Sequence, residues 1–138
     1  MSFELGWMRA LVALLKGEAP PGELTTIEYQ GIPVTLDRPK GFVQEGVDKA
    51  GAPWRRLYLY DYGFIPGTQG GDGEDLDVFV GPDPEADTAY WVTQAKADGS
   101  FDEYKVFLGF SSAEHARLAY WLHIPPQFMV EMRAQPIG

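Results

Sequence analysis

The side chains best suited to chemistry gather in one short stretch near the middle of the sequence. Asp72, Glu74, Asp75 and Asp77 place four carboxylates within six residues, directly before the apolar run 78–80. Carboxylates this close repel one another, and a divalent cation bound through their oxygens removes that repulsion. The stretch therefore predicts a divalent-cation site, and its structural alternative is an ordinary hydrophilic turn rich in Asp and Gly.

A second charged stretch contains Asp98, Glu103 and Lys105. By itself it is typical of a hairpin turn with a charged rim. Beside the first stretch it supplies what phosphoryl transfer requires, which is charge neutralisation on several oxygens and an in-line nucleophile. Carboxylates hold Mg²⁺, bound cations lower the pKa of a shared water, and lysine and arginine hold phosphate oxygens.

Composition limits the other classes of function. The chain has 138 residues, of which 45% are hydrophobic and 14% aromatic, and this indicates one globular domain with its own core. It contains no cysteine, so a disulfide framework and a thiolate metal site are both excluded. The net charge of −9 argues against general nucleic-acid binding, which needs a cationic surface. The same charge fits either a protein that binds divalent cations or a solubilising acidic surface.

The first residues have the pattern of an amphipathic helix, and the apolar segment is far too short to span a bilayer. We predict that residues 1–20 form an N-terminal amphipathic helix and linker, and that residues 21–138 form the main domain. The helix is expected to dock on the protein's own core, across a homo-oligomer contact or on a phage partner. The apolar residues that share its face are Leu5, Met8, Leu11, Val12 and Leu15.

Beyond the linker the pattern is typical of short β-strands separated by turn residues. Gln30–Gly31 predicts a tight hairpin turn, and residues 41–51 a glycine-rich excursion. Ser111 and Glu114 predict the capping box of a helix that Pro125 ends. The sequence thus predicts a mainly β (α+β) fold: a small closed OB-like β-barrel, with the N-terminal helix and one helix after the last barrel strand. The expected strands are 27–29, 32–36, 57–60, 76–80, 89–94 and 104–110, and the tail 128–132 is expected to return as a strand or a short helix.

Three motifs in series resemble those of soluble (family I) inorganic pyrophosphatases. They are Tyr62-Gly63-Phe64-Ile65, then Asp72-Gly73-Glu74-Asp75-Leu76-Asp77, then Asp98 with Glu103 and Lys105. Their order and internal spacings match the family, and the resemblance covers residues 30 to 132. The runs 62–68, 77–82 and 101–110 are similar, more narrowly, to the pyrophosphatase-like domain of phage and mobile-element polyvalent proteins.

This resemblance implies roles for individual residues. Glu74 would take the proton from the attacking water, and Asp77 would bridge two cations. The implied cofactor is Mg²⁺, with Mn²⁺ as an alternative. The implied metal ligands are Asp72, Asp77, Asp98 and Glu103. The implied catalytic residues are Glu74, Asp77, Lys105 and Tyr62, and the implied substrate-binding residues are Arg55, Arg56, Lys40, Lys105 and Tyr62.

The resemblance implies metal-dependent hydrolysis of inorganic pyrophosphate, or a related diphosphate, by in-line attack of a metal-bound hydroxide. We expect a cytoplasmic protein, in the host cytoplasm if it is phage-encoded, with a small phosphate substrate, no general nucleic-acid binding and no membrane partner. One alternative is a non-catalytic phage structural or docking protein that retains the fold and is associated with the virion. Another is a nucleotide or alarmone hydrolase that uses the same metals.

Departures from the family pattern bear on these alternatives. Glu74 stands where an aspartate is more usual, so its carboxylate reaches one methylene further. The family's tyrosine–lysine pair near the C-terminus has no clear counterpart, with only Tyr120 and His123 available, and Glu45 is the candidate for the carboxylate nearer the N-terminus. The missing pair favours the docking protein, whereas the intact set of acids favours the enzyme.

Overall fold

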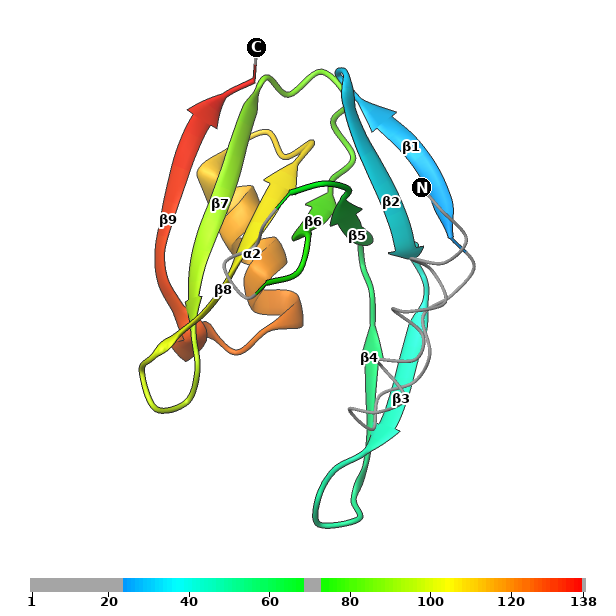
Figure 1. The fold of residues 1–138 in the computed structure, drawn as a ribbon, viewed down its shortest axis with the longest axis vertical. Helices are drawn as coiled ribbons and strands as arrows, with labels where there is room; N and C mark the ends of the chain where they lie inside the picture. The colour runs from blue at the N-terminus through cyan, green and yellow to red at the C-terminus, as the bar shows by residue number, and fades with distance from the viewer. Residues whose placement is uncertain (1–23, 69–72, 138) are drawn as a thin grey trace.

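The computed structural model describes residues 24–68 and 73–137. The helix predicted over residues 1–20 and the predicted metal ligand Asp72 therefore lie outside the described residues. The described part holds nine β-strands, one α-helix and one short 3₁₀-helix (Figure 1). None of the helices in this part is long and apolar enough to cross a membrane. The elements are β1 (Thr25–Tyr29), β2 (Ile32–Arg38), β3 (Val43–Val47), β4 (Pro53–Leu57), β5 (Asp61–Ile65), β6 (Leu76–Val80), β7 (Thr88–Ala95), β8 (Phe101–Leu108), α2 (Ala113–His123), η1 (Pro126–Phe128) and β9 (Met129–Pro136).

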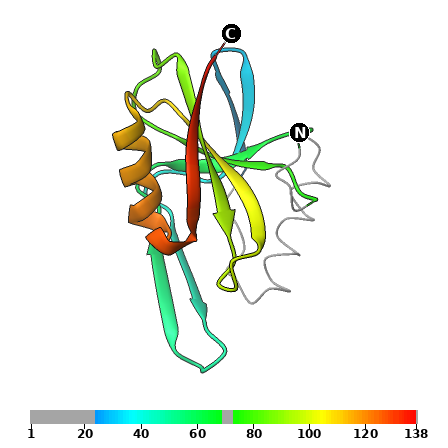
Figure 2. The same ribbon diagram turned by 90° about the vertical axis from the view of Figure 1, so that its left-hand side faces the viewer.

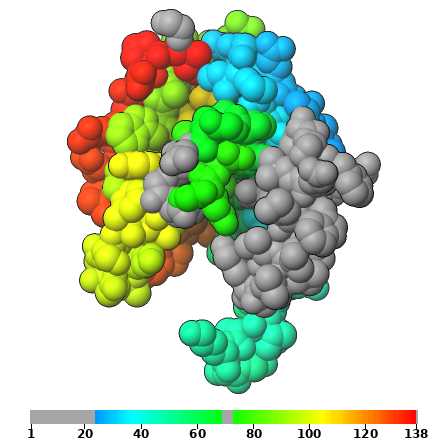
Figure 3. Space-filling view, viewed as in Figure 1, coloured from blue at the N-terminus to red at the C-terminus, as the bar shows by residue number. Residues whose placement is uncertain are grey.

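Seven of the strands form one sheet in the order β1-β2-β5-β6-β8-β7-β9, and β3 pairs with β4 in a separate hairpin. Neighbouring strands are antiparallel except β6 and β8, which are parallel. In Figure 1 the sheet bends like the two slopes of a tent, with β9 and β1 at its ends. Figure 2 shows α2 on one side of the sheet, and Figure 3 shows the β3–β4 hairpin as a projection from the body.

The described strands form an open sheet, which differs from the closed barrel that the sequence predicts. Closing the sheet would require hydrogen bonds between β1 and β9. Among the described residues, β1 pairs with β2 alone and β9 with β7 alone. The bend of the sheet already buries an apolar cluster between its two slopes, so burial does not depend on closure. This cluster contains Tyr29, Val34, Leu36, Val78, Val80 and Leu108.

Alternation along the central strands gives the sheet two buried faces. On β6, Val78 and Val80 join the cluster between the slopes, whereas Phe79 joins a second cluster on the opposite face. Helix α2 covers that second face and buries Ala116 and Tyr120 completely. The chemistry described below lies at the end of this helix-covered face.

Several local predictions are confirmed. Tyr29 pairs with Ile32 across Gln30 and Gly31, whose φ angles of 47° and 86° give the twist of a primed hairpin turn. The predicted strand 76–80 is β6, and the apolar tail returns to the sheet as β9.

The helix cap is one residue later than predicted, because the hydroxyl of Ser112 accepts from the amide of His115 at 3.1 Å.

The predicted glycine-rich excursion is wrong in one respect, because residues 43–57 form the β3–β4 hairpin. The glycines of this segment have separate roles. Gly46 lies under the ring of Trp54, where a Cβ would come within 2.6 Å of the indole, and Gly51 has the positive φ of a tight turn. The sequence alone does not distinguish a glycine that makes room for a neighbouring ring, as Gly46 does, from a glycine that interrupts a strand.

Gly63 on β5 lies opposite Leu36, where the backbone of β2 passes too close for any side chain. An added Cβ would lie 2.7 Å from the carbonyl carbon of Thr35 and 2.8 Å from the Cα of Leu36. We expect Gly63→Ala to lower the free energy of unfolding by about 3 kcal/mol, because backbone atoms cannot rotate away from the new methyl group. Urea denaturation measures this loss. Gly99→Ala is the control, since that open turn has a φ of 88° and should cost only about 1–2 kcal/mol of backbone strain. Equal losses in the two variants would contradict the close approach.

Candidate functional site

Part of the predicted site comes together where the helix-covered face of the sheet ends. Asp77 on β6 is the direct neighbour of Lys105 on the parallel strand β8. Because side chains alternate along a strand, Asp77 shares a face with Phe79, and Glu103 and Lys105 share a face with Phe107. On both strands, charged side chains therefore continue the face on which the buried rings of Phe79 and Phe107 lie.

Lys105 is at the centre of these charged groups. Its Nζ donates to the hydroxyl of Tyr62 at 2.9 Å and to Oδ2 of Asp77 at 3.3 Å, and it forms an ion pair with Glu103. The Lys105 side chain is 9% exposed, and each carboxylate side chain is 15% exposed. We refer to Tyr62, Asp77, Glu103 and Lys105 as the lysine cluster.

The lysine cluster fixes the charge of its members at neutral pH. Burial alone would lower the pKa of Lys105, but Tyr62, Asp77 and Glu103 outweigh that effect and raise the pKa well above its usual value. Burial, together with the charge of Asp77, raises the pKa of Tyr62 well above its usual value. The cluster therefore presents an ammonium and a neutral phenol, and both can donate to a phosphate oxygen. Buried ion pairs add little net stability, so a binding role accounts better for this arrangement.

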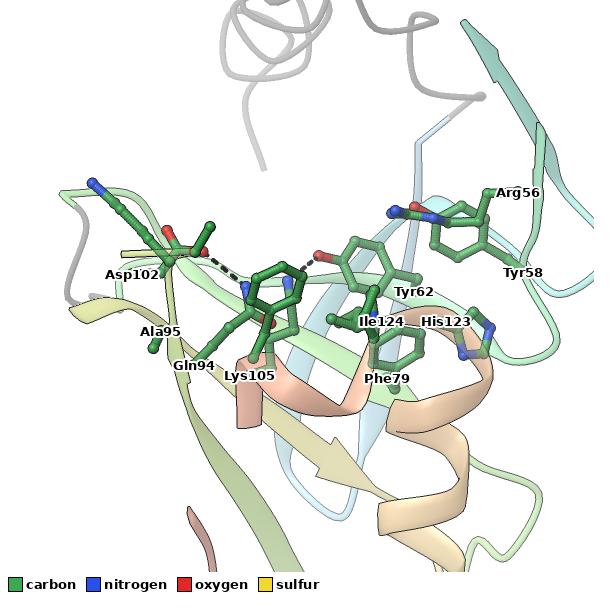
Figure 4. Close-up of a pocket in the computed structure, with 14 residues that line it drawn as sticks. Arg56, Tyr58, Tyr62, Phe79, Gln94, Ala95, Asp102, Lys105, His123 and Ile124 are labelled. Carbon is green, nitrogen blue, oxygen red and sulfur yellow. Dashed lines mark hydrogen bonds between the residues drawn. The ribbon is translucent and has the colours of Figure 1, made fainter. Parts of the chain in front are cut away.

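Lys105 and Tyr62 line a pocket of about 350 Å³ (Figure 4). Two further cationic side chains line it, Arg56 from β4 and Lys96 just after β7, together with the carboxylate of Asp102. Since Asp77 and Glu103 already pair with Lys105, Arg56 and Lys96 are the charges that favour an anionic ligand. Of the two arginines predicted to bind substrate, Arg56 is the one that reaches the pocket.

A chain of hydrogen bonds holds the acidic side of the pocket. The hydroxyl of Tyr120 on α2 donates to Oε1 of Gln94 at 2.9 Å, and Nε2 of Gln94 donates to Oδ2 of Asp102 at 2.8 Å. Burial raises the pKa of Tyr120 to about 12, so this phenol stays a donor. The register between β7 and β8 shifts beside Asp102, which interrupts the alternation of the strand there. The roles of Lys96, Gln94 and Asp102 cannot be read from the sequence, because a register shift leaves no local sequence signal.

His123, the last residue of α2, lines the pocket as a neutral ring. The amide of Leu59 donates to its Nε2 at 3.0 Å, and Nδ1 lies 2.7 Å from the carbonyl oxygen of Ala119. Since the Leu59 amide can only donate, Nε2 accepts and Nδ1 carries the proton. Burial lowers the pKa of His123 below its usual value. Neither His123 nor Tyr120, which is turned toward Gln94, supplies the missing cation near the C-terminus.

The bonding of His123 predicts a pH dependence of stability. Below a pH of about 6.5 the unfolded chain takes up a proton on this histidine before the folded protein does. The free energy of unfolding should therefore fall as the pH falls below that value, and level off below the lowered pKa of the folded state. His123→Leu should remove this part of the slope of the free energy of unfolding against pH. It should also cost about 1–3 kcal/mol at pH 7, because the Leu59 amide loses its acceptor. Urea denaturation between pH 5 and pH 7.5 measures both effects, and His115→Gln should keep the slope. A slope that persists in His123→Leu would contradict the assignment.

Two predicted site residues lie on exposed turns and strands apart from the lysine cluster. Asp98 is in the β7–β8 turn, where the amide and hydroxyl of Ser100 donate to its Oδ1 at 2.9 Å and 2.6 Å. These bonds hold the pKa of the Asp98 carboxyl below its usual value. Arg55 is exposed on β4 and forms an ion pair with Glu45 at 3.2 Å.

The remaining predicted residues are near the chain's loops. Lys40 is exposed between β2 and β3, and its backbone amide donates to Asp61 at 2.8 Å. Glu74 is exposed just before β6, two residues before Leu76 begins the strand. The structure thus brings together Tyr62, Asp77, Glu103 and Lys105, with Arg56 in the adjoining pocket.

The lysine cluster offers two carboxylates to a cation, Asp77 and Glu103. Within residues 24–68 and 73–137, no group of three or more histidine, aspartate or glutamate side chains has the geometry of a metal site. Proteins commonly hold Mg²⁺ through one or two carboxylates, with water and substrate phosphate completing the octahedron. The two carboxylates fit that manner of binding, in which the phosphate substrate supplies further ligands.

Comparison with known proteins identifies a family. A family model described as Inorganic Pyrophosphatase matches residues 22–136. No curated protein and no solved structure matches the chain. The matched range contains every strand and helix that positions the lysine cluster.

Proposed function

Because the chain belongs to the inorganic pyrophosphatase family, we propose that it hydrolyses inorganic pyrophosphate, or a related diphosphate, with the help of a divalent cation. The family generally uses Mg²⁺. The observation that carries the proposal is the lysine cluster, a charged lysine between two mostly buried carboxylates beside a pocket that Arg56 and Lys96 also line. Such a cluster combines groups that bind phosphate with groups that bind a cation.

Different residues of the site bind different parts of the diphosphate. Tyr62 and Lys105 donate to the oxygens of the phosphate that is attacked, and Arg56 and Lys96 add positive charge for the leaving phosphate. A divalent cation held by Asp77 and Glu103 would neutralise phosphate oxygens and lower the pKa of the attacking water. The other residues of the site hold the substrate in its orientation, because phosphoryl transfer depends mainly on positioning and on charge neutralisation.

Glu74 is proposed as the base that takes the proton from the attacking water. Its exposure means that solvent can replace it in part, so we expect Glu74→Gln to lower turnover by about 10²–10³-fold, the lower part of the range for general-base catalysis. The affinity for the cation should change little. Glu74→Asp should fall between the wild type and Glu74→Gln, because the shorter side chain keeps the carboxylate but withdraws it. Steady-state rates at saturating Mg²⁺ test this order, and a Glu74→Gln variant at full rate would remove Glu74 from the mechanism.

The proposed activity is tested by phosphate release from pyrophosphate. The full chain is assayed with Mg²⁺, Mn²⁺ or Ca²⁺, and with a chelator in place of metal. We expect release with Mg²⁺ and Mn²⁺, less with Ca²⁺, whose looser coordination suits in-line attack poorly, and none with the chelator. Release at the chelator level under all three metals would contradict the proposal.

A second candidate function is that of a docking protein that retains the fold, and exposed apolar side chains favour it. Leu118, Trp121 and Leu122 on α2 are 51%, 46% and 50% exposed, and Val130 on β9 is 63% exposed. The three helix residues lie at the spacing of one helical stripe, where a solvated face would be polar. The narrower similarity to phage and mobile-element domains, and the contact proposed for residues 1–20, fit such a role. Trp121→Glu should then reduce the particle mass in light scattering, and an unchanged mass would argue against this candidate.

A further inference from the structure

We infer that the pocket beside the lysine cluster binds the organic group of a diphosphate ester, an apolar or aromatic group attached to the diphosphate. This inference rests on the proposed function, because it places the diphosphate itself at the lysine cluster. It concerns the side of the pocket that a free pyrophosphate ion would leave unused.

The lining of the pocket is of two chemical kinds. Arg56, Lys96 and Lys105 carry positive charge. The half-buried Ile124 and Phe128, together with the almost fully buried Phe79, form its apolar side and offer only carbon atoms. Phosphate oxygens held against those carbon atoms would lose hydration without gaining a donor. An apolar or aromatic group would be stabilised by the same contact, because it removes apolar surface from water.

Two aromatic residues extend this apolar side. The ring centroid of His123 lies 4.7 Å from that of Phe79 and 5.8 Å from that of Tyr58. Both nitrogens of the neutral His123 ring are bonded to backbone groups, and the Tyr58 hydroxyl donates to Gln44 at 3.0 Å. The polar atoms of both side chains are thus engaged, and both rings are buried against their neighbours, so they support the apolar side from behind and add no polar group to it.

The apolar side directly adjoins the phosphate-binding groups. Phe79 packs on Tyr62 with ring centroids 4.6 Å apart, and Figure 4 shows Ile124 beside the same two side chains. The pocket of about 350 Å³ is more than twice the size of an apolar cavity of about 150 Å³ that holds benzene. It therefore has room for a group of that size next to a diphosphate at the lysine cluster.

The reaction on such an ester is the same hydrolysis with a larger leaving group. The oxygen of water forms a new bond to the terminal phosphorus while the bridging P–O bond breaks. The organic monophosphate leaves with the bonding electron pair, and the proton lost by the water passes through a base to solvent. The products are inorganic phosphate and an organic monophosphate.

Binding gives a test that does not depend on turnover. Calorimetry of the full chain with Mg²⁺ compares methylenediphosphonate, which is not hydrolysed, with its phenyl ester. We expect the ester to bind at least about tenfold more tightly, the lower end of what one group contributes in a hydrophobic pocket. Phe128→Ala, and separately Ile124→Ala in case one variant folds poorly, should remove that advantage while leaving methylenediphosphonate binding unchanged. Leu118→Ala, an exposed residue of α2 outside the pocket, is the control and should behave as wild type. An ester that binds no more tightly, or an advantage that survives in both pocket variants, would overturn the inference.

Turnover then separates this inference from the proposed function. Phosphate release is compared for pyrophosphate, phenyl diphosphate, isopentenyl diphosphate and ADP, which distinguish an aromatic ring, an aliphatic chain and a nucleoside. We expect at least one ester to be hydrolysed, with kcat/KM lowered about tenfold or more by Phe128→Ala and unchanged for pyrophosphate. Hydrolysis of pyrophosphate alone, with no preference for the ester in binding, would overturn the inference and leave the proposed function standing. Tight ester binding without release from any substrate would support the binding pocket and overturn the proposed function.

Discussion

Lys105→Met should lower the turnover of pyrophosphate by about 10³–10⁵-fold, the effect of removing one positioned cation from a transferring phosphoryl group. The ammonium of Lys105 contacts Tyr62, Asp77 and Glu103 in the structure, so its charge is held in one position at the site. Methionine keeps most of the volume of the lysine side chain, and the loss therefore reports charge and hydrogen bonding more than packing.

The same variant should also be less stable when no divalent cation is present. Lys105→Met removes the positive charge that Asp77 and Glu103 both contact, and such a loss in a mostly buried ion pair costs about 3 kcal/mol. A divalent cation can supply the missing charge between the two carboxylates, so Mg²⁺ should stabilise Lys105→Met more than it stabilises the wild type. Urea denaturation with chelator and with millimolar Mg²⁺ measures the difference. Lys49→Met on the exposed β3–β4 turn is the control and should leave both rate and stability unchanged. A Lys105→Met variant with near-wild-type turnover would show that the lysine cluster is structural.

Asp77→Asn should remove nearly all turnover while keeping the fold. Asparagine has the shape of aspartate but no charge, so it can neither pair with Lys105 nor balance a divalent cation. A bound cation contributes several kcal/mol of transition-state stabilisation, which corresponds to about 10³-fold in rate or more. The apparent affinity for Mg²⁺ should fall as well, and raising the Mg²⁺ concentration should recover only part of the rate.

The control for Asp77→Asn is Asp87→Asn, which makes the same chemical change on the exposed connection between β6 and β7. Rates and Mg²⁺ titrations of the two variants are compared at matched protein concentration. Wild-type turnover in Asp77→Asn, or an equal loss in Asp87→Asn, would rule out a specific role of Asp77 at the cation.

Local sequence patterns predicted most of the strands and part of the site. The run 76–80 has an acid and then an apolar alternation, and this places Asp77 and Phe79 on one face of β6 whatever the neighbours are. The spacing of Glu103 and Lys105 likewise puts both on one face of β8. Motif order then identified Tyr62 as the fourth member of the cluster, and the structure brings these side chains into contact.

The features that the sequence did not predict depend on contacts between distant segments. The parallel pairing of β6 with β8 joins residues far apart in the chain, and the open edges of β1 and β9 follow from how the whole sheet bends. Lys96 and Asp102 reach the pocket through the β7–β8 turn and the register shift beside it. The neutral state of His123 follows from its burial and from a bond to Leu59 in the β4–β5 connection, which no spacing within α2 reveals.

The most direct test of the account is the rate of phosphate release from pyrophosphate by the wild type and Lys105→Met, assayed side by side with saturating Mg²⁺. The lysine cluster predicts steady release by the wild type that stops when the Mg²⁺ is chelated, and a rate lower by about 10³-fold or more in the variant. A wild type that releases no phosphate above the chelated blank, or two proteins that release it at the same rate, would contradict the claim that this cluster is the site of diphosphate hydrolysis.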